Sequence, residues 1–113
     1  MSNRSLGTVG EQVAFSYLVQ HGYTVVAKNI RIGGVEIDLI VKKGQNIHIV
    51  EVKKRTSSLF GGFEEAIDRR KMRRLMRAAS VLVAQYSQCT VQIDVIFIST
   101  NFPLQHLQNI EIS

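Results

Sequence analysis

The sequence contains a single cysteine, Cys89, among its 113 residues. One cysteine excludes an internal disulfide and a zinc site built on cysteine ligands, and it suits a reducing cytoplasm. No apolar run approaches the roughly 20 residues that a membrane-spanning helix needs, and the first five residues lack the apolar core of a secretory signal. We therefore expect a cytoplasmic protein with no membrane partner.

Several catalytic and binding patterns are also missing. The sequence has no Gly-rich phosphate loop and no Ser/His/Asp grouping, and its three histidines, His21, His48 and His106, show no metal-ligand spacing. We expect His48, which alternates with Val50 and Val52, to be a packed strand residue. The chain has no repeat, low-complexity tract or linker, so residues 1–113 are predicted to form one domain.

Acidic residues are scarce and unusually placed. Nine Asp and Glu stand against 14 Lys and Arg, for a net charge of +5, which favours a polyanionic partner. The basic residues concentrate in two stretches, 53–55 and 69–77. Four acids lie inside otherwise apolar segments: Glu11, Asp38, Glu51 and Asp94.

The hydrophobic periodicity predicts two helices, Gly7–His21 and about Phe63–Tyr86. A loop is predicted at 56–62. The apolar stripe predicted for the second helix comprises Met72, Leu75, Met76, Ala79, Leu82, Val83 and Tyr86. Its opposite side carries Arg69, Arg70, Arg73, Arg74 and Arg77, with Lys71 at the border and able to lean toward a sheet.

Runs of β-branched and aliphatic residues predict the strands Tyr23–Ile32, Val35–Val41, Ile47–Lys53 and Val91–Ser99. Gly33-Gly34 and the 42–46 stretch are predicted turns. Residues 104–112 fit either a short edge strand or a helical turn. The order αβββαβ predicts an α/β fold with a mixed central β-sheet flanked by helices.

Two of the predicted strands carry charged residues where apolar ones would be expected. Carboxylates such as Asp38 and Glu51 are costly to bury unless a cation or hydrogen bonds compensate. Because side chains alternate along a strand, Glu51 and Lys53 should project from the same face. Two acids and a lysine on adjacent strands suggest a divalent-metal site for phosphodiester chemistry, whereas a purely structural ion-pair cluster is the alternative.

The motifs Gly10-Glu11, Gly22-Tyr23, Glu36 to Ile40, Val50 to Arg55 and Ile93 to Ile96 occur in a familiar order. Together they resemble the YraN-like family of uncharacterised bacterial proteins, which belongs to the restriction-endonuclease-like PD-(D/E)XK nuclease superfamily and is similar to Holliday junction resolvases. The resemblance covers roughly residues 7–98. It implies that residues 1–113 form a single nuclease-like domain. Val35 and Gln92 depart from the family pattern, and neither is a metal ligand.

The resemblance implies a role for each matching residue. Asp38 and Glu51 would bind Mg²⁺ or Mn²⁺, the carbonyl of Val52 would complete the site, and Lys53 would be the catalytic lysine. Glu11 matches an extra acid of resolvase-like members, although the helix dipole explains an acid at that place equally well. Resolvases of this fold act as two-fold dimers, so the resemblance also allows a homodimer.

The arginines of the second helix repel one another, and a phosphate backbone would relieve that repulsion. The predicted nucleic-acid-binding residues are Lys54, Arg55, Arg69, Arg70, Lys71, Arg73, Arg74 and Arg77. A solvated helix face is the alternative. No feature indicates base-specific recognition.

Two further acids have less defined roles. Glu36 has the same strand parity as Asp38, so it would either support the metal site or pair with a nearby lysine. Asp94 is expected to form a structural bridge with Lys71 or Arg31 rather than to bind metal.

The sequence thus predicts a Mg²⁺- or Mn²⁺-dependent endonuclease-like protein acting on DNA, including branched or structured DNA. The alternative is a nucleic-acid-binding or complex-assembly module with the same fold and little or no catalytic activity. An RNA substrate stays open, with DNA favoured.

Overall fold

The computed structural model describes residues 9–54 and 69–110. Its elements are α1 (Val9–Gln20), β1 (Thr24–Ile32), β2 (Val35–Lys43), β3 (Asn46–Lys54), α2 (Arg69–Gln85), β4 (Thr90–Ile98) and β5 (Gln105–Leu107). The predicted order αβββαβ is confirmed, and the tail forms the edge strand rather than the helical turn. Arg55, the predicted loop at 56–62 and the predicted start of the second helix lie outside the described residues.

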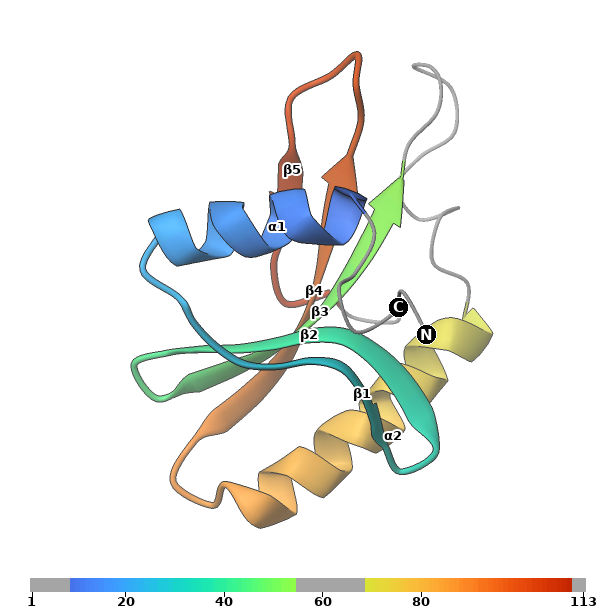
Figure 1. The fold of residues 1–113 in the computed structure, drawn as a ribbon. Helices are drawn as coiled ribbons and strands as arrows, with labels where there is room; N and C mark the ends of the chain where they lie inside the picture. Colours follow the sequence, from blue (N-terminus) through green and yellow to red (C-terminus); the bar gives the residue numbers. More distant parts are fainter. Residues whose placement is uncertain (1–8, 55–68, 111–113) are drawn as a thin grey trace, which may run out of the picture.

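The five strands form one sheet in the order β1-β2-β3-β4-β5 (Figure 1). The hairpin-connected strands β1, β2 and β3 pair antiparallel, β3 and β4 pair parallel, and β5 pairs antiparallel with β4. Parallel neighbours need a crossover connection, and here the crossover contains α2. The sheet is therefore mixed, as the sequence predicts.

Gly33 and Gly34 make the tight turn between β1 and β2. Both have positive φ, 57° and 79°, which two-residue hairpin turns require and which glycine adopts without strain. A Cβ atom on Gly33 would lie 3.4 Å from Val81 Cγ2, so this turn packs closely against α2.

The two helices cover opposite faces of the sheet (Figure 1). On one face, Met72, Leu75, Ala78 and Leu82 of α2 pack with strand residues such as Ile49. On the other face, the α1 residues Ala14 and Leu18 pack with buried residues including Tyr23, Leu39, Val41, Val50 and Ile96. Each core layer is thus closed by one helix.

The apolar stripe predicted for the second helix is partly wrong. Met76 and Val83 are 49% and 51% exposed, whereas Ala78, absent from the predicted stripe, is buried. The contact with the sheet is narrow, because the buried positions 72, 75, 78 and 82 follow one line along the helix. Met76 and Val83 lie farther from this line and reach solvent, whereas Ala79 and Tyr86 of the predicted stripe are partly buried against the core.

Strand β2 changes its facing direction at Asp38. Ile37 and Ile40 both pack in the α2 layer, while Leu39 and Val41 pack in the α1 layer. A regular strand would place Ile37 and Leu39 on the same face. The strand therefore departs from strict alternation around Asp38, which is also where its pairing with β3 ends at Leu39 and Val50.

None of the helices in the described ranges 9–54 and 69–110 is long and apolar enough to cross a membrane.

Candidate active site

Asp38 is held at the point where β2 diverges from β3. The backbone N–H of Val52 donates a hydrogen bond of 2.8 Å to Oδ2 of Asp38, and the Asp38 side chain is only partly buried. This bond satisfies one carboxylate oxygen from the neighbouring strand and fixes the direction of the group. The carboxylate is therefore positioned before any ligand arrives.

Glu51 is a buried carboxylate shared by two lysines. The Glu51 side chain is 6% exposed, and its Oε2 lies 3.5 Å from Lys53 Nζ and 3.3 Å from Lys71 Nζ. Lys53 follows on the same face of β3, as predicted, and Lys71 reaches the site from α2, as its border position indicated. Both lysines are about one-third exposed, so their ammonium groups connect the buried carboxylate to solvent.

Burial raises the pKa of the Glu51 carboxyl above its ordinary value, and the nearby charge of Asp38 raises it further. Lys71 and Lys53 act in the opposite direction because their positive charges favour the ionised form. A carboxylate that is buried beside a second carboxylate stays ionised only if nearby positive charge stabilises it. In this structure the two ammonium groups supply that charge.

The donor set of Asp38 and Glu51 fits a hard divalent cation. Mg²⁺ and Mn²⁺ prefer oxygen ligands, and Mg²⁺ commonly uses one or two carboxylates while keeping several waters. Within residues 9–54 and 69–110, no group of three or more His, Cys, Asp or Glu side chains is placed to hold a metal ion. The described residues therefore do not gather Glu11 with Asp38 and Glu51 into a three-carboxylate site.

Glu11 lies instead at a pocket between α1 and the first two strands. This cavity, which we call the α1–β1 pocket, has a volume of about 290 Å³ and is lined by Glu11, Gln12, Phe15, Ser16, Lys28, Asn29 and Leu39. The ligand role predicted for Glu11 stays a prediction.

The arginine side of α2 is exposed as the sequence predicts. Five arginines share this surface, which we call the arginine face: Arg69, Arg70, Arg73, Arg74 and Arg77. Lys54, at the end of β3, is exposed as well, and Arg55 lies outside the described residues. Lys71 belongs to the carboxylate site rather than to the arginine face, because its ammonium contacts Glu51.

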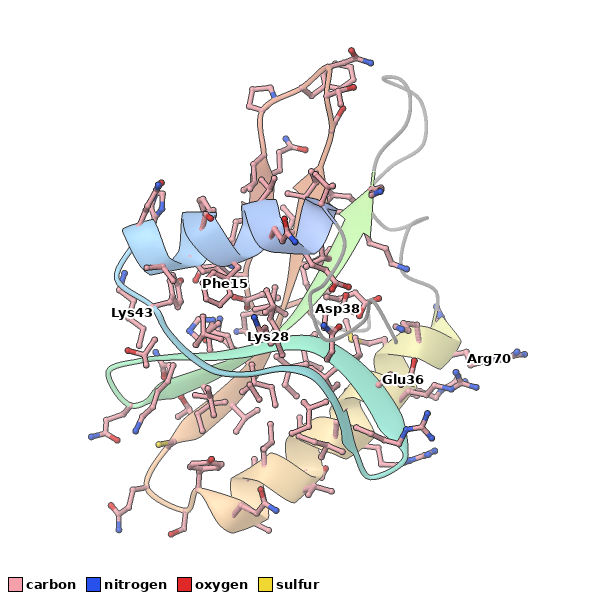
Figure 2. The ribbon with its side chains drawn as sticks, viewed as in Figure 1. Phe15, Lys28, Glu36, Asp38, Lys43 and Arg70 are labelled. Atoms are coloured by element: carbon pink, nitrogen blue, oxygen red, sulfur yellow. The ribbon has the colours of Figure 1, made fainter. Side chains whose placement is uncertain are left out.

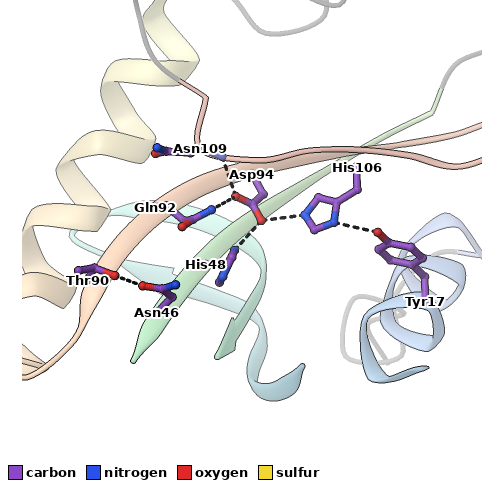
Figure 3. Close-up of polar contacts among 8 residues, drawn as sticks. All are labelled: Tyr17, Asn46, His48, Thr90, Gln92, Asp94, His106 and Asn109. Carbon is purple, nitrogen blue, oxygen red and sulfur yellow. Dashed lines mark hydrogen bonds and ion pairs between the residues drawn. The ribbon is translucent and has the colours of Figure 1, made fainter. Parts of the chain in front are cut away.

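The partners expected for Asp94 are wrong. Arg31 pairs with Glu36 at 2.9 Å on the exposed β1–β2 hairpin, and Lys71 pairs with Glu51. Asp94 is fully buried, and its carboxylate is hydrogen-bonded to two histidines that local sequence patterns do not link to it (Figure 3). Its structural role, predicted in preference to metal binding, is consistent with these contacts.

Four donors surround the Asp94 carboxylate (Figure 3). His48 Nδ1 lies 2.6 Å and His106 Nε2 lies 2.8 Å from Oδ2, while Gln92 Nε2 and the Asn109 backbone N–H each donate to Oδ1 at 3.0 Å. Burial by itself raises the pKa of Asp94, but these hydrogen bonds outweigh it and hold the pKa well below its usual range. Asp94 is therefore a buried anion whose charge is stabilised by its surroundings.

The network extends from Asp94 to helix α1. The Tyr17 hydroxyl lies 3.0 Å from His106 Nδ1, so α1 is connected through β5 to the centre of β4. His48 is a buried strand residue, as predicted, but its bond to Asp94 was missed. The only local signal was an acid in the middle of an apolar strand, because His48 and His106 are 46 and 12 residues away in the chain.

A sequence model of the Uncharacterised protein family UPF0102 matches residues 10–98. The chain belongs to this family. A UPF0102 protein of Bacteroides thetaiotaomicron is 36% identical over 110 residues, covering 94% of this chain and 91% of the relative. A UPF0102 protein of Mycolicibacterium vanbaalenii is 40% identical over 97 residues, covering 84% of this chain and 80% of the relative. The predicted resemblance to the YraN-like family, that is UPF0102, is confirmed.

A solved structure with the same fold is Hjc, a Holliday junction resolvase from the archaeal hyperthermophile Archaeoglobus fulgidus. The match has a TM-score of 0.58 at 15% sequence identity and covers 89% of the UPF0102 chain and 74% of Hjc. At this identity the match establishes the fold. The predicted restriction-endonuclease-like fold is confirmed.

Proposed function

We propose that this protein is a Mg²⁺- or Mn²⁺-dependent phosphodiester hydrolase that cuts DNA, with branched or otherwise structured DNA as its substrate. The observation that carries the proposal is the buried Glu51 carboxylate, which lies beside Asp38 and contacts the ammonium groups of Lys53 and Lys71. A nuclease fold with two oxygen donors and a partly exposed lysine contains the groups that metal-assisted hydrolysis needs.

Asp38 and Glu51 would hold the metal ion, which when bound polarises the phosphoryl oxygen and lowers the pKa of a bound water. The Val52 N–H keeps Asp38 oriented, and burial of Glu51 limits competition from solvent. Lys53, one-third exposed on the same strand face, can stabilise negative charge on the phosphate or orient the attacking water. These residues would therefore act as a preorganised group.

The arginine face supports a nucleic-acid substrate. Guanidinium groups bind phosphate oxygens in a two-pronged geometry, and the resulting attraction does not depend on base sequence. The similarity to Hjc, a Holliday junction resolvase, supports structured DNA over RNA as the first substrate to test. A homodimer, which the family resemblance allows, is part of this proposal.

The proposal is tested by incubating the full-length protein with linear, supercoiled, flapped and four-way-junction DNA in Mg²⁺ or Mn²⁺, with matched RNA substrates alongside. We expect wild-type protein to cut at least one structured DNA and the Asp38→Asn and Lys53→Ala variants to lose that cleavage. Glu36→Gln is the matched control, because Glu36 is an exposed acid on the same strand whose carboxylate pairs with Arg31 of the β1–β2 hairpin, neither the metal-site support nor the lysine partner expected from the sequence. It should cut at the wild-type rate.

Two results would overturn the proposal: absence of cleavage on every substrate, or cleavage that persists in Asp38→Asn. DNA retarded in a gel without cleavage would favour the nucleic-acid-binding module. Cleavage of RNA alone would preserve the chemistry and reject DNA as the substrate.

A further inference from the structure

The α1–β1 pocket is lined by residues that flank Asp38 on β1 and β2. In the pairing of β1 with β2, Lys28 lies opposite Leu39 and Ile30 lies opposite Ile37, so Asn29 falls opposite Asp38. Lys28, Asn29 and Leu39 all line the pocket. Figure 2 shows Phe15, Lys28 and Asp38 between α1 and the sheet. A ligand in the pocket would therefore lie beside the stretch of β2 that carries Asp38.

Asn29 supports this connection from the backbone. Its φ of 50° is in the left-handed region, which is uncommon for residues other than glycine although asparagine adopts it more readily than most. Unusual backbone conformations concentrate at functional sites, and this one occurs at the pocket residue that falls opposite Asp38. The unusual conformation and the cavity are independent observations at one place.

We propose that this pocket receives one unstacked nucleobase of the substrate, next to the phosphate that lies at Asp38 and Glu51. The inference rests on the proposed function and adds a substrate class to it. It predicts that the preferred DNA has an unpaired nucleotide beside the cleavage position, as at a flap or a branch point, rather than a continuous duplex.

The chemistry of the walls suits a base better than a phosphate. Leu39 is buried and Phe15 presents a ring, so part of the lining is flat and apolar, whereas Gln12 and Asn29 offer amide donors and acceptors. Every base has a π face that stacks on an aromatic ring and edges that form hydrogen bonds. One lysine and one glutamate line the pocket, so their charges cancel and an anion gains little there.

The size of the cavity also limits the ligand. About 290 Å³ lies at the lower end of the range for small-molecule sites, roughly 300–1,000 Å³. This leaves room for one planar ring system rather than for two stacked nucleotides. Lys28 Nζ lies 5.2 Å from the centre of the Phe15 ring, and the exposed Lys28 side chain can move toward the adjacent phosphate when a base occupies the ring.

The preference for unpaired DNA follows from the cost of entry. A base in a duplex must be unpaired and unstacked before it can enter a side pocket, and this cost is smallest when the nucleotide is already unpaired. The pocket would therefore select substrates by how easily a base can leave its stack, with no need for base-specific contacts.

Binding without divalent metal tests the inference separately from cleavage. The probe is a set of flapped DNAs with 2-aminopurine at successive unpaired positions near the branch, compared with the continuous duplex in EDTA by fluorescence and anisotropy. We expect wild-type protein to bind flapped DNA more tightly and to change the fluorescence at one position. Phe15→Leu, which keeps apolar volume but removes the ring, should weaken binding to the flap about fivefold or more and leave duplex binding unchanged.

Two controls accompany Phe15→Leu. Phe15→Tyr keeps the ring and should retain the wild-type preference, and Val13→Ala changes an exposed α1 residue outside the pocket. If Phe15→Leu lowers flap and duplex affinity equally, or changes neither, the pocket does not bind a base. A Phe15-dependent preference for flapped over duplex DNA without any cleavage would keep this inference and reject the hydrolase. Cleavage without that preference would keep the hydrolase and reject this inference. Absence of DNA binding would reject both.

Discussion

The ammonium of Lys71 lies 3.3 Å from Oε2 of Glu51, the same oxygen that Lys53 approaches at 3.5 Å. Lys71 belongs to α2 and Glu51 to β3, so this contact joins the arginine-bearing helix to the carboxylate site. A divalent cation at Asp38 and Glu51 would compete with these ammonium groups for the carboxylate. The lysines therefore influence both the ionisation of Glu51 and its availability to metal.

Removing Lys71 should raise the pKa of Glu51 further. Burial and Asp38 already raise it, and Lys71 is one of the two groups that oppose this rise. In Lys71→Gln the ionised form loses that support, so the acid side of any pH–rate profile controlled by Glu51 should move to higher pH. Carboxyl ¹³C NMR titration of Glu51 measures the shift directly. Arg70→Gln, which removes an exposed charge one residue away, should leave the Glu51 titration near that of the wild type.

Replacing Glu51 with Gln should stabilise the protein at neutral pH by about 0.5–2 kcal/mol, the size of a typical single stabilising substitution. The folded-state pKa of Glu51 lies above its ordinary value of 4.5, so ionisation lowers stability as pH rises through the interval between the unfolded and folded values. Glu51→Gln removes this penalty. Urea unfolding at several pH values should show a difference that grows upward from about pH 4.5. A less stable variant at pH 7 would contradict the prediction.

Asp94→Asn should destabilise the fold by about 2–5 kcal/mol. Asp94 accepts four hydrogen bonds on two oxygens, and an amide group would direct its NH₂ at two of those donors. The folded-state pKa of Asp94 is lowered, so its stabilisation is complete above the unfolded value near 3.8 and is lost only as pH falls below it. Thermal unfolding should therefore show that Asp94→Asn is less stable than the wild type at pH 7. Its stability should also fall less than that of the wild type as the pH drops below about 4.

Replacing arginines of the arginine face should change the salt dependence of DNA binding. Each lost phosphate contact reduces the slope of log affinity against log salt by about 0.9 on duplex DNA. We expect Arg70→Gln combined with Arg74→Gln to lower the slope by about 2, with the loss similar for all sequences. Lys43→Gln removes the same kind of charge on the opposite side of the molecule (Figure 2) and should leave the slope unchanged. An unaltered slope in the double variant would reject the arginine face as the docking surface.

Local patterns were sufficient to predict most of the elements and part of the site. Glu51 and Lys53 meet because side chains alternate along a strand, and the arginines share one side because a helix repeats every 3.6 residues. Both relationships depend on short separations in the chain. The family motifs supplied the fold, and the border position of Lys71 on its helix indicated that it would lean toward the sheet.

Strand pairing decided what local patterns do not determine. Asp94 meets His48 because β3 and β4 are parallel neighbours, and it meets His106 because β5 folds back beside β4. The register of β1 on β2 places Asn29 opposite Asp38 and so brings the α1–β1 pocket to the site. Periodicity determines which face a residue takes, but the residue it faces across the sheet depends on strand order and register. Strand order and register emerge only when the whole chain packs, and in this protein they decided the surroundings of Asp94 and of Asp38.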